Sequence, residues 1–63
     1  MTGKEFKIKR INLDLTQTQL AAELGLQANT VSRYETGEMT VPKAVELALE
    51  TIERRLAAQT AEN

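Results

Sequence analysis

Hydrogen-bonding side chains fall at helical spacing near the middle of the chain. Asn29, Ser32 and Arg33 lie on a different helical face from the apolar Val31 and Tyr34. Amide, hydroxyl and guanidinium groups offer directional donors and acceptors. Catalysis is a poor alternative, because the chain has no His and no Cys, and no nucleophile–base pair or paired carboxylates are visible. We therefore expect noncovalent hydrogen bonding here, with no metal and no cofactor.

The length of the chain leaves room for one small domain. Its 63 residues fall below the usual domain size, and a chain of this length buries only about 60% of its unfolded surface. A core this small has little space for a substrate pocket, which typically needs roughly 300 Å³. The sequence therefore predicts a single domain over residues 1–63 and argues against an enzyme.

The charge balance is slightly acidic and uneven. Eight Lys and Arg against nine Asp and Glu give a net charge of −1 and a pI near 5.3. Residues 1–35 hold five cations and four anions, a net +1, whereas residues 36–63 hold three and five, a net −2. The overall basicity that usually marks a nucleic-acid binder is absent, although a local basic face is still compatible with these counts.

Targeting signals are not visible in the sequence. No apolar run approaches the roughly 18–20 residues of a membrane span. The basic residues near the N-terminus are not followed by the apolar stretch of a signal peptide. Together with the absence of Cys, these features favour a cytoplasmic protein without a membrane partner.

Composition and spacing predict helices rather than strands. Good helix formers dominate, and the only aromatic residues are Phe6 and Tyr34. The alternation of Ile11, Leu13 and Leu15 could suggest a strand. A helical period accounts for the N-terminal segment better, and it predicts a first helix that ends at about Leu13.

The next two helices carry clear start and stop signals. Thr16 and Gln19 fit a capping box that begins a second helix. Gly25 can supply the left-handed residue that ends this helix. A third helix is predicted at about residues 28–35, and Gly37 is suited to the positive φ that ends it.

The last helix is predicted to be long. Pro42 fits its first position, with Thr40 or Val41 as the cap. No Gly or Pro follows, so one helix should continue to about Ala58, with residues 59–63 fraying. Its apolar stripe consists of Val45, Ala48, Leu49, Ile52 and Leu56.

Two short helices joined at Gly25 predict a helix-turn-helix. Residues 15–26 (LTQTQLAAELGL) and 30–37 (TVSRYETG) resemble the Cro/repressor-type (XRE) helix-turn-helix family of lambdoid phage repressors. The motif covers about residues 16–36. The resemblance implies an all-α, lambda-repressor-like domain of four or five helices that binds operator DNA, commonly as a dimer. The helix at about 28–35 would then lie in the major groove.

The resemblance also assigns contacts to double-stranded DNA, residue by residue. Asn29 could pair with adenine and Arg33 with guanine, each contributing about 1–3 kcal/mol of discrimination. Ala28 departs from the polar residue often found at its position and can offer only apolar contact. The expected base contacts are Gln27, Ala28, Asn29, Ser32 and Arg33. The expected phosphate contacts are Gln17, Thr36, Thr40, Lys43 and Arg10.

Some of these residues have competing interpretations. Arg10 and Glu35 match family positions that form an internal ion pair, and this role is compatible with phosphate binding because a guanidinium has spare donors. Arg33 could instead be a solvated side chain that contacts Asn29, four residues earlier. Tyr34 is expected in the core. A solvated helix face and long-range attraction to DNA are equally good explanations for Lys4, Lys7 and Lys9.

The C-terminal helix departs from the family pattern, which usually breaks at a Gly-containing turn and adds a fifth helix. Its apolar residues exceed what one small core needs, so we expect this helix to supply a homodimer surface. The residues concerned are Leu47, Leu49, Ile52, Leu56 and Ala57.

Two functions remain in competition. The first is a sequence-specific transcriptional regulator that reads operator half-sites about one helical turn apart. A protein that contacts six to ten phosphates loses about 10³–10⁵-fold in affinity between 50 and 200 mM salt. This chain has few phosphate-facing cations, so its affinity for DNA should fall less. The alternative is an antitoxin or anti-repressor type interaction module, with a protein partner and weak or partner-dependent DNA binding. The chain could also be a fragment of a longer regulator.

Overall fold

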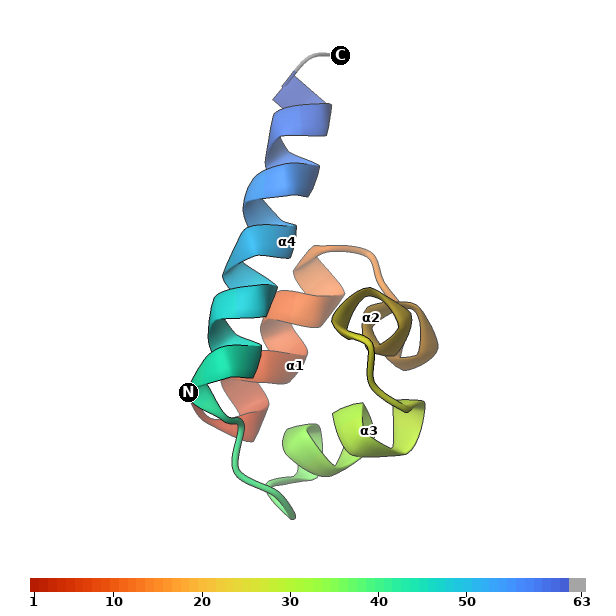
Figure 1. The fold of residues 1–63 in the computed structure, drawn as a ribbon, viewed down its shortest axis with the longest axis vertical. Coiled ribbons are helices and arrows are strands. Elements are labelled where there is room, and N and C mark those ends of the chain that lie inside the picture. Colours follow the sequence, from red (N-terminus) through yellow and green to blue (C-terminus); the bar gives the residue numbers. More distant parts are fainter. Residues whose placement is uncertain (62–63) are drawn as a thin grey trace.

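Four helices account for most of the chain. The computed structural model describes the backbone of residues 1–61 and the side chains of residues 1–59. The helices are α1 (Gly3–Asn12), α2 (Gln17–Leu24), α3 (Ala28–Thr36) and α4 (Lys43–Ala61). The described residues contain no strand. Helix α3 packs against α1 and α2, and α2 also packs against α4. Figure 1 shows the C-terminal part of α4 extending past the other helices. The all-α prediction, with a long last helix, is confirmed.

Capping boxes begin both of the first two helices. The Thr16 hydroxyl accepts from the Gln19 backbone N–H at 3.0 Å, and the Gln19 side chain accepts from the Thr16 N–H at 2.9 Å. This is the predicted cap. Thr2 and Glu5 form the same arrangement at the start of α1, where the sequence analysis had identified no cap. Helix α1 ends at Asn12, one residue before the expected position.

The two predicted glycine stops are present. Gly25 has φ 71° and Gly37 has φ 83°, both in the left-handed region that costs glycine little. After α2, the Leu26 N–H donates to the Ala21 carbonyl at 2.8 Å and the Gly25 N–H donates to the Ala22 carbonyl at 3.3 Å. This pair of bonds is the Schellman ending, and it satisfies carbonyls that would otherwise be left without partners.

Both ends of α4 differ from the prediction. The helix begins at Lys43, and the carbonyl of Pro42 accepts from the Glu46 N–H at 3.1 Å. Pro42 therefore occupies the capping position that had been assigned to Thr40 or Val41. The helix also continues through Ala61, so the expected fraying is wrong for residues 59–61. Residues 62–63 lie outside the described part of the chain.

The core joins all four helices. Phe6 of α1 meets Tyr34 of α3 edge to face, with ring centroids 5.5 Å apart, which is a favourable aromatic geometry. Leu49 is fully buried and Ile52 is 5% exposed. The expectation that these two residues of α4 form a dimer surface is therefore wrong, because they complete the core of one chain. The buried residues are Phe6, Leu20, Ala21, Val31, Tyr34, Val41, Leu49 and Ile52.

Ion pairs attach α4 to its neighbours. The Lys9 ammonium of α1 lies 3.2 Å from Glu53, and the Arg55 guanidinium lies 2.5 Å from Glu23 of α2. The Met1 amino group lies 3.1 Å from Glu46. Lys9 therefore acts as a contact between helices, which neither interpretation of the N-terminal lysines had included. The Lys9 and Arg55 pairs are partly solvent-exposed, and pairs at a protein surface contribute only about 0–1 kcal/mol each. The buried stripe of α4 therefore supplies most of its attachment.

Candidate nucleic-acid interface

Packing between α2 and α3 fixes the position of α3. Leu20 and Ala21 of α2 are buried together with Val31 of α3, and the small side chain of Ala21 allows the helices to approach closely. Leu24 and Leu26 pack at the edge of this contact. Because the two helices are packed firmly together, the outward side chains of α3 start from a fixed backbone position. A precise binding site needs a rigid element of this kind.

The outer face of α3 carries polar side chains. Val31 and Tyr34 are buried on its inner face, whereas Asn29 and Arg33 are exposed and Ser32 is half-buried on the outer face. Because 3.6 residues make one helical turn, Asn29 and Arg33 lie one above the other, with Ser32 beside them. Gln27 is exposed directly before the helix, and Ala28 is half-buried at its first residue. The five residues expected to contact bases therefore lie on one short helix and its N-terminal cap.

Arg33 has a carboxylate neighbour that the sequence analysis did not identify. Its Nε lies 3.4 Å from Oε2 of Glu38, in the loop after α3, and the two side chains are 58% and 68% exposed. No hydrogen bond joins Arg33 to Asn29 among the described residues. Both charges face solvent, so the pair is weak and open to competition from another anion.

A buried carboxylate joins three helices. Glu35 of α3 accepts from Arg10 of α1 at 2.6 Å (Nε to Oε2) and at 3.3 Å (Nη2 to Oε1). It also accepts from Gln17 Nε2 of α2 at 3.0 Å. Arg10 Nη1 donates to the Leu15 carbonyl at 2.8 Å. The Glu35 side chain is 4% exposed, so its charge is compensated inside the protein. This is the internal ion pair that the resemblance implied, extended to Gln17.

Two of the residues expected to contact phosphates, Arg10 and Gln17, belong to this unit, and the other three come later in the sequence. Thr36, Thr40 and Lys43 are exposed and lie from the end of α3 to the start of α4. The Thr36 hydroxyl donates to the Arg33 carbonyl at 3.2 Å and accepts from the Glu38 N–H at 3.4 Å, which orders the loop. Gln17 is half-buried at the first residue of α2 and is held by Glu35.

Most cations of the protein have carboxylate partners. Lys9, Arg10, Arg33, Arg54 and Arg55 each form an ion pair. Within residues 1–59, only Lys4, Lys7 and Lys43 among the eight Lys and Arg have no such pair. Lys4 and Lys7 lie on α1, which packs against α3, and Lys43 is the first residue of α4. The positive charge available to an anionic partner is therefore small.

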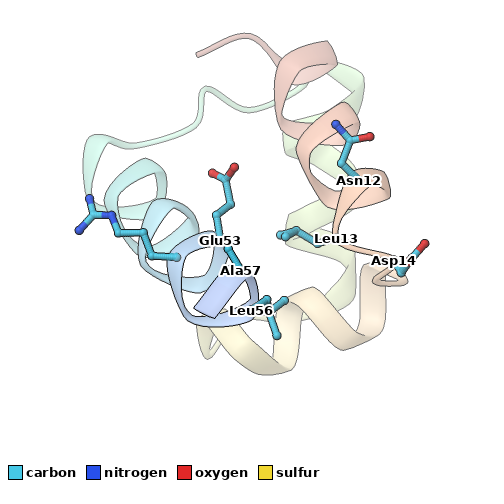
Figure 2. Close-up of a pocket in the computed structure, with 7 residues that line it drawn as sticks. Asn12, Leu13, Asp14, Glu53, Leu56 and Ala57 are labelled. Carbon is cyan, nitrogen blue, oxygen red and sulfur yellow. The ribbon is translucent and has the colours of Figure 1, made fainter. Parts of the chain in front are cut away.

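A shallow groove lies at the other end of the molecule. It encloses about 730 Å³ between the C-terminal end of α1 and the second half of α4. Figure 2 shows Leu13 pointing from the end of α1 towards α4, with Leu56 and Ala57 on the opposite wall. Asp14, which adopts φ 59°, and Arg54 belong to its rim.

The described residues form neither a cluster of metal-ligating side chains nor a membrane-spanning helix. They hold no group of three or more His, Cys, Asp or Glu side chains that could bind a metal ion. None of their helices combines the length and hydrophobicity needed to cross a bilayer.

The family of the chain follows from its sequence match. A family model described as helix-turn-helix matches residues 6–49, which cover α1 to the middle of α4. This chain belongs to the Cro/repressor-type (XRE) helix-turn-helix family. Membership identifies it as a DNA-binding regulator of the XRE type. No curated protein and no solved structure matches the chain.

Besides the Arg33–Glu38 pair, the sequence patterns left two contacts unidentified, for different reasons. Thr2 and Glu5 stand three residues apart, so the capping-box pattern could have revealed them. The contact between Gln17 and Glu35 joins residues 18 apart on different helices. Only the crossing angle of α2 and α3 brings these two side chains together, and no local pattern encodes it.

Proposed function

We propose that this protein is a sequence-specific transcriptional regulator that reads operator half-sites in the major groove with α3. The observation that carries the proposal is the division of α3 into two faces. Val31 and Tyr34 lock one face into the core, and Asn29 and Arg33 stand exposed on the other. An α-helix fits the major groove, where amide and guanidinium groups distinguish adenine and guanine by paired hydrogen bonds.

Each residue at the interface then has a role. Asn29 pairs with adenine and Arg33 with guanine, while Gln27 and Ser32 supply further hydrogen bonds to base edges. Ala28 makes apolar contact with a thymine methyl group. The phosphate contacts come from Gln17, Thr36, Thr40 and Lys43, and from Arg10 through its remaining N–H groups.

The proposal includes two copies on one operator, with half-sites about 34 Å apart. Each copy is one domain over residues 1–63. The dimer surface is smaller than the sequence suggested, because Leu49 and Ile52 lie in the core. Of the expected residues, Leu47, which is 51% exposed, Leu56 and Ala57 remain. Leu56 and Ala57 line the groove with Leu13 near the C-terminal turns of α4, and this part is the proposed contact. Asp14 and Arg54 on its rim carry opposite charges, so a two-fold contact can pair one with the other.

NMR titration with a mixed-sequence duplex at low salt tests the proposal. We expect the largest shift changes in Gln17, Asn29 and Arg33. Ile8 and Ile11, on the outer face of α1, serve as internal controls and should change little. Phe6 contacts Tyr34, so the outer faces of α1 and α3 point away from each other. Changes confined to the outer face of α1 would contradict this site.

One observation favours the rival function. Five of the eight cations are already paired with carboxylates, and the net charge is −1, so electrostatic attraction to DNA is weak. A protein-interaction module that binds DNA only with its partner would show these features. It would give no shift changes with any duplex, and a stable complex with a protein partner would be recovered.

A further inference from the structure

We propose that Glu35 is a positioning residue for DNA-backbone binding. Its carboxylate, with its charge balanced by Arg10, holds the Gln17 amide at the start of α2 so that one N–H points outward to a phosphate. This inference rests on the proposed function and deepens it, because it assigns to an internal ion pair a part in binding DNA.

The chemistry of the contact fixes the orientation of the amide. An ionised carboxylate can only accept hydrogen bonds. Glu35 Oε1 must therefore face the NH₂ end of Gln17, and the observed distance from Nε2 is 3.0 Å. One of the two amide hydrogens is used in this bond, and the second remains to donate outward. A neutral partner at position 35 would lose this control, since an amide can present either of its ends.

Burial makes the contact selective. The Glu35 side chain is 4% exposed, so water competes poorly for its oxygens. Gln17 is the first residue of α2, next to the Thr16 cap, and its backbone is therefore fixed as well. The side chain is held at both ends before DNA arrives, so little conformational freedom is lost on binding.

Arg10 balances a charge that would otherwise oppose the contact. The Glu35 carboxylate is separated from the proposed phosphate position only by the Gln17 amide. Without a compensating positive charge, it would repel the phosphate. Arg10 donates two hydrogen bonds to Glu35, at 2.6 and 3.3 Å, and a third to the Leu15 carbonyl. It therefore supports DNA binding through Glu35, in addition to any contact of its own with a phosphate.

A double-mutant cycle on DNA affinity tests the proposal. The probe is a labelled mixed-sequence duplex of about 20 base pairs, long enough for two half-sites one turn apart, and binding is measured by fluorescence anisotropy. We expect Gln17→Ala and Glu35→Gln each to weaken binding about tenfold, and the double variant to bind no worse than either one. Glu50→Gln removes one negative charge from the exposed face of α4 and is the matched control. Its effect should be small and additive with Gln17→Ala.

Additive losses from Gln17→Ala and Glu35→Gln would overturn the inference, because they would leave Glu35 a purely structural role. Such a result would not affect the proposed function, since the wild-type protein would still bind DNA. A wild-type protein that binds no duplex overturns both.

A second measurement needs no variant and covers the case in which Glu35→Gln fails to fold. Relaxation of the side-chain NH₂ groups in the free protein should show Gln17 as rigid as the backbone. The exposed Gln27, which makes no side-chain cap bond, should be mobile on the ps–ns timescale. Equal mobility of Gln17 and Gln27 would overturn the positioning role.

Discussion

At the scale of single residues, Arg33 is exposed for recognition but is held beside a carboxylate. Glu38 lies 3.4 Å from its Nε on the same surface. The Nη groups of Arg33 remain free to pair with guanine while Nε keeps this contact, but the carboxylate repels nearby phosphates. If α3 reads DNA as proposed, we expect Glu38 to lower affinity for every DNA sequence and to leave base preference to Arg33.

We predict that Glu38→Gln tightens DNA binding. The gain should reach up to about fivefold at low salt, because an exposed ion pair is worth about 0–1 kcal/mol. It should shrink as salt screens the charges. Anisotropy titrations at two salt concentrations measure the effect, with Glu50→Gln as the control of equal charge change. Weaker binding by Glu38→Gln would show instead that the carboxylate positions Arg33 productively.

The N-terminal cap predicts a dependence of stability on pH. The pKa of Glu5 lies below its ordinary value of 4.5, chiefly because its carboxylate accepts a hydrogen bond from the Thr2 backbone N–H, with the Thr2 hydroxyl as the second cause. A lowered pKa means that the charged form stabilises the fold. This contribution is present above about pH 4.5 and is lost as the pH falls through the lowered value.

Glu5→Gln keeps an accepting oxygen in the cap but does not titrate. The difference in Tm between wild type and this variant should be largest near neutral pH and should shrink in acid. Circular dichroism melts across the acid range measure this difference. A gap that stays constant with pH would show that the charge of Glu5 does not contribute.

At the scale of secondary structure, two glycines are required for different reasons. Gly25 has φ 71°, and a Cβ at this position would meet no neighbouring atom. Only its backbone conformation therefore disfavours other residues. Gly3 begins α1 against the end of α3, where a Cβ would collide with the Tyr34 and Glu35 carbonyl oxygens. The first is a conformational requirement and the second a steric one.

Matched substitutions separate the two causes. Gly25→Ala should cost about 1–2 kcal/mol, the penalty of the left-handed conformation, and Gly25→Asn should cost less because Asn adopts it more readily. Gly3→Ala should cost about 1–3 kcal/mol through overpacking, and Gly3→Asn at least as much. Urea denaturation measures all four variants. A neutral Gly3→Ala would contradict the close packing of α1 on α3.

Sequence signals predicted the local features of these elements and failed where tertiary packing decides. The Thr16–Gln19 box and the Gly25 and Gly37 stops are encoded within a few residues, and all three are present. Leu49 and Ile52 lie on a regular apolar stripe, but periodicity does not say whether that stripe covers its own core or a second chain. The Gln17–Glu35 contact depends in the same way on how two helices cross.

At the scale of the whole molecule, most charge is used internally. Ion pairs link α1 to α3, α1 to α4 and α2 to α4. Among the described residues, Lys4, Lys7 and Lys43 are the Lys and Arg side chains without a carboxylate partner. The sequence divides into a weakly positive half that contains the motif and an acidic C-terminal half. In the folded protein, most of these charges are paired with each other. Under the proposed function, we expect affinity for DNA to come from fit, from the pairing of two copies or from a protein partner.

Dimer formation can be measured by sedimentation. We predict a concentration-dependent dimer that Ala57→Glu shifts to monomer, because it places a charge in the groove formed with Leu13 and Leu56. Ala57 is exposed, so the Tm of the variant should stay close to that of wild type. Thr51→Glu, at another exposed position of α4, is the control and should leave the dimer intact. A wild-type protein that stays monomeric at high concentration, with and without DNA, rules out this surface.

Selection of bound sites from random DNA, run in parallel with wild type and Arg33→Ala, tests whether the outer face of α3 recognises DNA sequence. We predict that wild type enriches a two-fold site with half-sites about one helical turn apart. Arg33→Ala should enrich the same site but lose its preference at one base pair in each half, equivalent to about 1–3 kcal/mol of discrimination. Identical preferences for the two proteins, or no enrichment of any sequence by wild type, would contradict recognition of DNA by the outer face of α3.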